Sequence, residues 1–147
     1  MTRDAMGAWR AFLEVHARLM PLIEQQLHLD GDLTHAQYGV LLALQGEPHG
    51  LTMTEIARTM VVSKSGLTYQ VDRLVDSGRC TRAVDPDDER RRVVRLTRAG
   101  IEALDDVREG HLALVREHFI GPAMDSDVAA IARALAAINA HLKAADA

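Results

Sequence analysis

Apolar residues recur at helical spacing along most of the chain, and the gaps in that pattern divide it into successive segments. The pattern predicts long helices over about residues 7–27, 34–45, 97–120 and 125–144. Pro21 lies inside the first segment, where it removes one backbone hydrogen bond or kinks the helix, and residues 28–32 interrupt the pattern. The last segment alternates spacings of three and four residues, which is typical of helices that pack on other helices. Its apolar positions are Val128, Ile131, Leu135, Ile138 and Leu142.

Two shorter helical segments joined by a tight turn are predicted within residues 52–78. The first opens with Thr52-x-x-Glu55, a capping-box pattern in which each side chain bonds to the backbone of the other residue. The turn falls at the β-branched pair Val61-Val62, and Ser63 can cap the second helix. That second helix carries one apolar stripe, formed by Leu67, Val71, Leu74 and Val75.

The opposite face of this second helix is polar, with small residues at its leading end. Small residues let a helix approach a surface closely, and hydroxyl, amide and guanidinium groups bond to base edges and phosphates. Such a face is typical of the helix that enters the major groove in a helix-turn-helix protein. Taken alone, the segment leaves open an ordinary helical hairpin with a solvated face. The candidate DNA-binding residues are Ser63, Lys64, Ser65, Thr68, Tyr69, Gln70 and Arg73.

A charged hairpin is predicted directly after these helices. Two strand-like runs, residues 80–84 and 92–96, flank a turn at Asp85-Pro86-Asp87-Asp88, whose residue types favour a tight reversal. The tip is predicted to carry Arg90-Arg91-Arg92, and arginines suit the negative potential of a DNA minor groove. A solvated run of charges is the alternative, but the position after a helix-turn-helix favours a wing. Arg90 and Arg91 are therefore further candidate DNA contacts.

Together these motifs resemble those of the MarR family of transcriptional regulators. The matching residues are T-x-x-E-I-A from Thr52, the second-helix run ending at Gly78, Asp88-x-Arg90 in the hairpin and L-T-x-x-G from Leu96. The resemblance implies a mainly α fold with a small β-wing, an α+β arrangement. It places a winged helix-turn-helix DNA-binding domain at residues 34–98 and a helical dimerisation region at residues 1–33 and 99–147.

The same resemblance implies a homodimer that binds a pseudo-palindromic operator in double-stranded DNA. It also implies a repressor that a small aromatic or phenolic ligand releases. The side chains that suit such an effector combine aromatic surface with polar tips, and they are Trp9, Phe12, His16, Met20 and Tyr38. A fully packed core without a cavity is the alternative. The other function considered is a dimeric module that binds small molecules, or senses metals or redox state, with weak or altered DNA recognition.

Charge is distributed unevenly along the chain. The net charge is −4, but residues 52–98 carry ten Lys and Arg against seven Asp and Glu. The predicted DNA-binding segment is therefore locally positive, as attraction to phosphates requires. No apolar run of membrane-spanning length and no signal-peptide pattern stands out, so we expect a cytoplasmic protein without membrane contact.

Catalytic and metal-binding patterns do not stand out in the sequence. The chain has no nucleophile elbow, phosphate-binding loop or dinucleotide fingerprint, so we expect no enzyme activity and no cofactor. The seven histidines lack the dense spacing of a metal site, and we predict none. A single cysteine, Cys80, excludes an intrachain disulfide framework. It occupies a hairpin position that should be apolar, which favours a buried small hydrophobe over a redox sensor.

Overall fold

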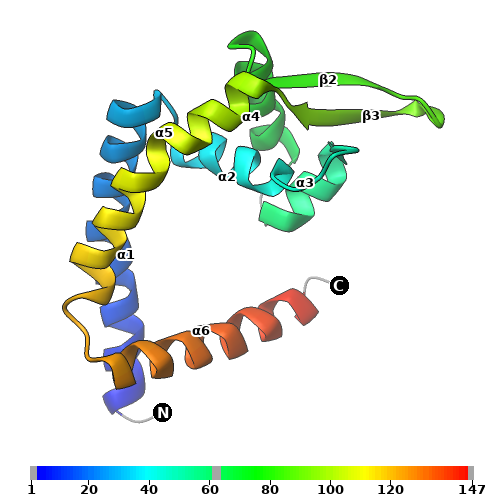
Figure 1. Cartoon of the computed structure of the whole chain (residues 1–147). Helices are drawn as coiled ribbons and strands as arrows, with labels where there is room; N and C mark the ends of the chain where they lie inside the picture. Colours follow the sequence, from blue (N-terminus) through cyan, green and yellow to red (C-terminus); the bar gives the residue numbers. More distant parts are fainter. Residues whose placement is uncertain (1–2, 61–63, 146–147) are drawn as a thin grey trace. The chain divides into compact units, whose positions relative to one another are not determined.

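A computed structural model describes residues 3–60 and 64–145 of the chain (Figure 1). It divides into two compact units, residues 1–111 and residues 112–147. The first unit contains a three-stranded antiparallel sheet and the helices around it, and the second is helical. The fold is thus mostly α with a small sheet, as predicted.

The helices of the first unit follow the predicted order. They are α1 (Arg3–Gly31), α2 (His35–Leu44), α3 (Met53–Met60), α4 (Lys64–Asp76) and α5 (Arg98–Val115), whose last residues belong to the second unit. A capping box starts α2, because Thr34 Oγ1 accepts from the Gln37 N–H and Gln37 Oε1 accepts from the Thr34 N–H, both at 3.1 Å. The predicted box at α3 is also present: Glu55 Oε2 accepts from the Thr52 N–H at 2.7 Å, and Thr52 Oγ1 accepts from the Glu55 N–H at 3.3 Å.

The first helix is longer than predicted, and the expected break at residues 28–32 was wrong. Helix α1 continues through Gly31 and ends where Asp32 takes a left-handed φ of 47°. His28 Nδ1 lies 3.4 Å from Asp32 Oδ1, a pairing of residues one helical turn apart. The apolar pattern stops early because the last turn faces solvent, where Leu29 is 72% exposed. Periodicity detects the buried face of a helix and therefore misses a solvated end.

The sheet has the strand order β1-β3-β2. Its strands are β1 (Leu51–Thr52), β2 (Cys80–Asp85) and β3 (Asp88–Leu96). The β2–β3 hairpin was predicted, and its ladder runs from the Cys80–Leu96 pair to the Asp85–Asp88 pair. Strand β1 was missed because it has two residues and Thr52 also takes part in the capping box of α3.

The hairpin turn is shorter than predicted. Strand β3 already begins at Asp88, so the turn itself consists of Pro86 and Asp87. Two side chains stabilise this end, since Asp85 Oδ1 accepts from the Asp87 N–H and Asp88 Oδ1 accepts from the Arg90 N–H, both at 3.0 Å. The arginines at positions 90–92, predicted at the tip, lie within β3.

The core of the first unit lies between the helices and the base of the hairpin. Of the predicted α4 stripe, Leu67, Val71 and Leu74 are buried and Val75 is half-buried. The buried apolar side chains are Ile23, Leu27, Leu33, Val40, Leu41, Leu44, Ile56, Leu67, Val71, Leu74, Cys80, Val93, Val94, Ala103, Leu104 and Val107. Burial of this stripe fixes α4 with its polar face directed outwards.

The second unit begins at the end of α5. The long helix predicted over residues 97–120 is α5 followed by a π-helical turn, η1 (Arg116–Ile120). After it comes α6 (Asp125–Ala145), close to the predicted bounds. The alternating apolar positions of α6 are partly exposed, by 38% at Ile131 and by 56% at Ile138.

Helix α6 also corrects the expectation about membrane-spanning length. Among the described residues it is the helix that is long and apolar enough to cross a membrane, with a mean hydropathy of 1.2. One such helix is weak support for a membrane span, because a core helix can pass the same test. The regular three-and-four spacing of its apolar side chains favours packing against another helix.

Candidate nucleic-acid interface

The outer face of α4 presents the side chains that were predicted to read DNA. Thr68, Tyr69 and Arg73 are exposed, with Tyr69 at 63%, while Gln70 is half-buried. Among the described residues, no hydrogen bond or ion pair engages the Arg73 guanidinium. The structure therefore brings these four predicted residues to one helix face, and it leaves Arg73 able to bond to an added partner. Ser63 lies outside the described residues, as do the side chains of Lys64 and Ser65.

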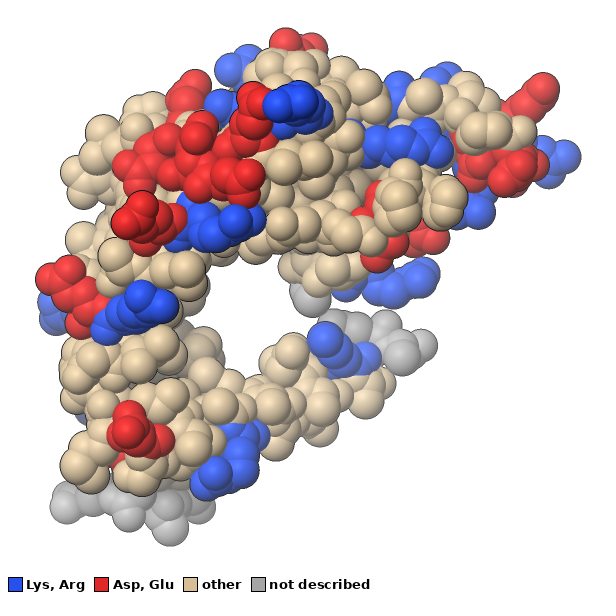
Figure 2. All heavy atoms as spheres, viewed as in Figure 1, with Lys and Arg blue, Asp and Glu red and all other residues tan. Residues whose placement is uncertain are grey.

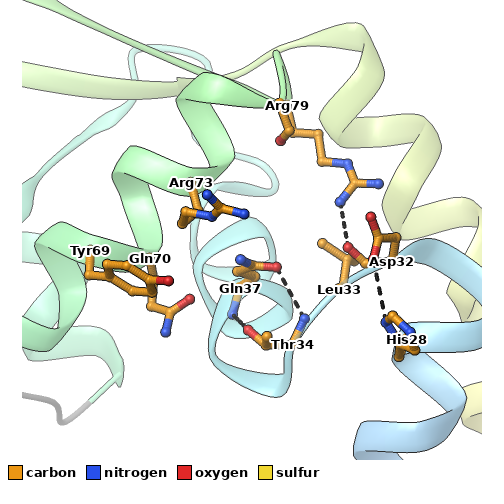
Figure 3. A pocket seen from close by; sticks show the side chains of 10 residues that line it. His28, Asp32, Leu33, Thr34, Gln37, Tyr69, Gln70, Arg73 and Arg79 are labelled. Carbon is orange, nitrogen blue, oxygen red and sulfur yellow. Dashed lines mark hydrogen bonds and ion pairs between the residues drawn. The ribbon is translucent and has the colours of Figure 1, made fainter.

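A pocket of about 270 Å³ lies between this face of α4 and the junction of α1 with α2. Figure 3 shows Tyr69, Gln70 and Arg73 on the α4 side and Thr34 and Gln37 on the other. The Gln70 Oε1 atom is buried and has no hydrogen-bond partner within the described residues. A buried acceptor without a partner can accept a hydrogen bond from a molecule bound in the pocket.

Sequence reasoning missed this pocket. Its remaining walls are formed by residues from two separate stretches of the chain: His28, Asp32, Leu33, Ser77 and Arg79. Nothing in their local sequence marks them, because the end of α1 and the end of α4 become neighbours only through folding. The pocket is lined by polar and charged side chains, unlike the aromatic site predicted from composition.

The wing arginines have different surroundings. Arg90 is exposed, whereas the Arg91 guanidinium lies 3.5 Å from Glu55 Oε1 and 3.9 Å from Asp85 Oδ2. Two carboxylates thus hold Arg91 over the start of α3, and Arg90 is the freer of the two for a phosphate or groove contact. A third arginine, Arg82, forms a 2.6 Å ion pair with Asp72 and so joins the hairpin to α4.

Surface charge separates along the first unit (Figure 2). Acidic side chains gather over α5, which carries Glu102, Asp105, Asp106 and Glu109. Basic and acidic side chains are mixed at the hairpin. The acidic α5 face opposes phosphate attraction, so the basic side chains of α4 and the hairpin are the candidates for phosphate contacts.

The residues predicted to bind an effector fall into two groups. On α1 the rings of Trp9 and Phe12 stack at 5.9 Å, and His16 lies 6.4 Å from Phe12. Tyr38 instead contacts His111 of α5 at 5.1 Å. Met20 is half-buried on α1.

His111 was not predicted, since no sequence motif marks it. Its Nδ1 atom is buried without a hydrogen-bond partner within the described residues. Burial, and to a lesser degree the nearby His35, lower the pKa of His111, so the imidazole favours its neutral form. Burial also raises the pKa of Tyr38. The two rings form a tilted aromatic contact between α2 and α5.

Cys80 is 2% exposed at the base of the hairpin. Burial raises the pKa of its thiol to about 11. Because the thiolate is the reactive form, this environment suits the expected role as a small buried hydrophobe. It does not suit a peroxide-sensing nucleophile.

An outward-facing polar helix preceded by a short capped helix and followed by an arginine-bearing hairpin defines a winged helix-turn-helix DNA-binding protein. The family model that matches, described as MarR family, covers residues 31–91. No curated protein sequence matches the chain. AbsC from Streptomyces coelicolor, a MarR family transcriptional regulator, is similar over 98% of this chain and 97% of its own, with 31% identity and a TM-score of 0.88. The chain belongs to the MarR family of DNA-binding transcriptional regulators.

Two further solved structures are similar over most of their length. Sco3205 from Streptomyces coelicolor, a MarR family regulator in complex with DNA, shares 27% identity over 97% of this chain and 93% of its own, with a TM-score of 0.89. CouR from Rhodococcus jostii RHA1, bound to p-coumaroyl-CoA, shares 25% identity over 87% of this chain and 88% of its own, with a TM-score of 0.76. Sco3205 and AbsC are both MarR family transcriptional regulators.

Proposed function

We propose that the protein is a homodimeric cytoplasmic repressor that binds a pseudo-palindromic operator and is released by a small ligand. The observation that carries the DNA-binding part is the outer face of α4. There Thr68, Tyr69, Gln70 and Arg73 share one helix face, and the wing that follows α4 carries the exposed Arg90. The complex of Sco3205 with DNA supports the same use of this fold.

In this proposal α4 enters the major groove and the hairpin lies along the DNA beside it. Amide and guanidinium groups such as Gln70 and Arg73 read base edges, while Arg90 contacts phosphate or the minor groove. Ser63, Lys64 and Ser65 complete the leading end of the helix. Helix-turn-helix proteins contact bases mainly with that N-terminal part, so these three residues stay within the proposed contact set.

The proposed dimer rests on apolar side chains that the chain leaves exposed. On α1 these include Trp9, Phe12 and Leu13, between 44% and 54% exposed, and on α6 they include Ile138 and Leu142 at 56%. Exposed apolar patches of this kind mark interfaces. A two-fold dimer places two α4 helices about one DNA turn apart, which matches a palindromic site.

The proposed effector is a small aromatic or phenolic acid. CouR bound to p-coumaroyl-CoA supports ligand response among relatives of this chain. The residues proposed to bind it are Trp9, Phe12, His16, Met20 and Tyr38, and the pocket beside α4 is a second place for such a molecule.

DNA binding is tested with the duplex that the protein selects from a randomised library. We expect Gln70→Ala or Arg73→Ala to weaken binding by about 1–3 kcal/mol and to relax specificity at the base that each reads. Arg90→Gln, at a phosphate contact, should instead lower the slope of log affinity against log salt by about one unit on all sequences.

A matched control for these variants is Arg108→Gln, which removes a charge from the acidic α5 face. Fluorescence anisotropy across a salt series measures each variant. Affinities equal to the wild type for all three interface variants would remove α4 and the wing from the mechanism.

A further inference from the structure

Arg79 lies three residues beyond the end of α4, and its backbone closes that helix. Gly78 takes a φ of 75°, and the Arg79 N–H bonds to the Leu74 carbonyl at 2.9 Å. This bond and the 3.0 Å bond from the Gly78 N–H to the Val75 carbonyl form a Schellman motif. The Arg79 carbonyl in turn accepts from the Thr97 N–H at 3.1 Å, at the start of α5. The backbone of Arg79 is therefore fixed between two helices.

The side chain of Arg79 joins this point to a third helix. Its Nη2 donates to the Gly31 carbonyl at 2.7 Å, and its Nη1 donates to the Asp32 carbonyl at 2.9 Å. These carbonyls terminate α1, where helical partners are missing and a cation is favoured by the helix dipole. Figure 3 shows the guanidinium reaching from the end of α4 to the end of α1. We call these two bonds the Arg79 bridge.

Open space lies next to the Arg79 bridge. The pocket of about 270 Å³ separates the outer half of α4 from the α1–α2 junction. Within the described part of the chain, no hydrogen bond crosses it from Tyr69, Gln70 or Arg73. Among the described residues, polar contacts across the pocket therefore do not set the distance from the outer half of α4 to the α1–α2 junction, and the buried stripe of α4 is held by apolar packing on its other side. The Arg79 bridge spans that distance at one end of the pocket with two charged hydrogen bonds of good length.

We propose that Arg79 is a positioning residue for DNA recognition, because its bonds to Gly31 and Asp32 fix the distance from α1 to α4. The inference rests on the proposed homodimer, in which α1 contributes to the contact between subunits. In such a dimer the distance from α1 to α4 sets the separation of the two α4 helices along the DNA. The Arg79 bridge thus selects operators by the spacing of their half-sites, while the outer face of α4 selects them by base sequence.

The test compares half-site spacings in one set of duplexes. The probe is the duplex that the wild-type protein selects from a randomised library, together with versions in which one base pair is inserted or removed between the half-sites. Arg79→Met keeps an apolar stem and removes every donor. Arg79→Lys keeps the charge but cannot reproduce the fork of an arginine. The matched control is Arg98→Met, which removes an exposed arginine that pairs with Glu102.

The measured quantity is the ratio of affinities for the selected and the altered spacings. We expect Arg79→Met, which loses both bonds of the bridge, to reduce this ratio by about tenfold. Arg79→Lys should give an intermediate loss, and Arg98→Met should keep the wild-type ratio. Far-UV circular dichroism and light scattering establish that each variant is folded and keeps its oligomeric state.

A wild-type ratio in folded Arg79→Met overturns the positioning role, even if that variant binds every duplex more weakly. A uniform loss of affinity is what a purely structural residue would produce. If Arg79→Met does not fold, the test depends on Arg79→Lys, and an unchanged ratio in that variant overturns the proposal. Failure of the proposed dimeric function would be visible in the wild type alone, as affinity that does not depend on half-site spacing.

Discussion

Glu55 joins α3 to the wing through its two carboxylate oxygens. Its Oε2 accepts from the Thr52 N–H at 2.7 Å and from the Thr52 hydroxyl at 3.0 Å. Its Oε1 lies 3.5 Å from Nη2 of Arg91. The hydrogen bonds from Thr52 lower the pKa of Glu55, and the charge of Arg91 contributes less. The Glu55 side chain therefore caps α3 and also holds the guanidinium of Arg91, a candidate DNA contact.

We expect the two functions of Glu55 to separate by substitution. Glu55→Gln should preserve the helix start, because glutamine serves in a capping box, whereas Glu55→Ala should cost about 1 kcal/mol of unfolding free energy. Since the folded pKa lies below the ordinary 4.5, the unfolded chain binds this proton more readily. The wild type should thus lose stability as the pH falls from 4.5 through the lowered pKa, and Glu55→Gln should lack that part of the loss.

Urea unfolding at neutral pH and along an acid series measures both effects. Glu102→Gln is the matched control, because Glu102 pairs with Arg98 on the surface and caps no helix. Equal destabilisation by Glu55→Gln and Glu55→Ala at neutral pH would show that the charge, and not the capping geometry, stabilises α3.

At the scale of the elements, the sequence predicted what depends on local chemistry. The capping-box start of α3 and the hairpin follow from side-chain bonds within three residues and from a Pro-Asp turn, and both were predicted. The box that starts α2 is equally local but was not predicted. The predicted end of α1 was wrong because solvated polar residues of a helix leave no apolar signal, as at His28 and Asp30. Strand β1 was missed because two residues gain strand geometry only by pairing with β3, through Leu51 with Val94.

The candidate site also has a part that could be predicted from local sequence and a part that could not. The outer face of α4 could be predicted, since burial of Leu67, Val71 and Leu74 dictates which residues face outwards. The pocket and the Arg79 bridge could not, because both bring together chain segments almost fifty residues apart, as in the bond between Arg79 and Gly31. Pairing of Arg91 with Glu55 and Asp85 was also invisible in the sequence.

Helix α6 carries the clearest test of the proposed dimer. Its apolar seam includes Ile138 at 56% exposure, while Ala140 lies on the opposite side of the helix by its spacing. We expect Ile138→Glu to shift the protein towards monomer, because a charge would be buried without a partner in the interface. Ala140→Glu adds the same charge on the other face and should leave the dimer intact.

Light scattering over a concentration series measures this equilibrium, with circular dichroism to show that α6 stays helical. A dimer of unchanged stability in Ile138→Glu would place the subunit contact elsewhere. Loss of the dimer in both variants would point to charge repulsion in general and not to the seam.

At the scale of the whole molecule, release from DNA requires a ligand that distinguishes two states of the dimer. A ligand weakens operator binding only by binding the released state more tightly, and a tenfold loss requires about 1.4 kcal/mol of coupling. Two places in the first unit could bind a small aromatic acid, and they offer different chemical groups to it. The aromatic residues of α1 offer stacking beside His16, and the pocket beside α4 offers the Arg73 guanidinium, which has no partner among the described residues.

Titration of salicylate-like acids against the operator complex distinguishes these places. We expect such acids to release DNA from the wild type, and His16→Ala and Tyr38→Phe to require at least several-fold more ligand if the aromatic residues bind it. His28→Ala alters the pocket beside α4 without changing a proposed DNA contact, so a loss of response in this variant alone would place the effector site in that pocket.

Calorimetry on the free protein separates lost ligand binding from lost coupling to DNA release. Release at wild-type concentrations from all three variants would exclude both places, and no release from the wild type would exclude this class of ligand.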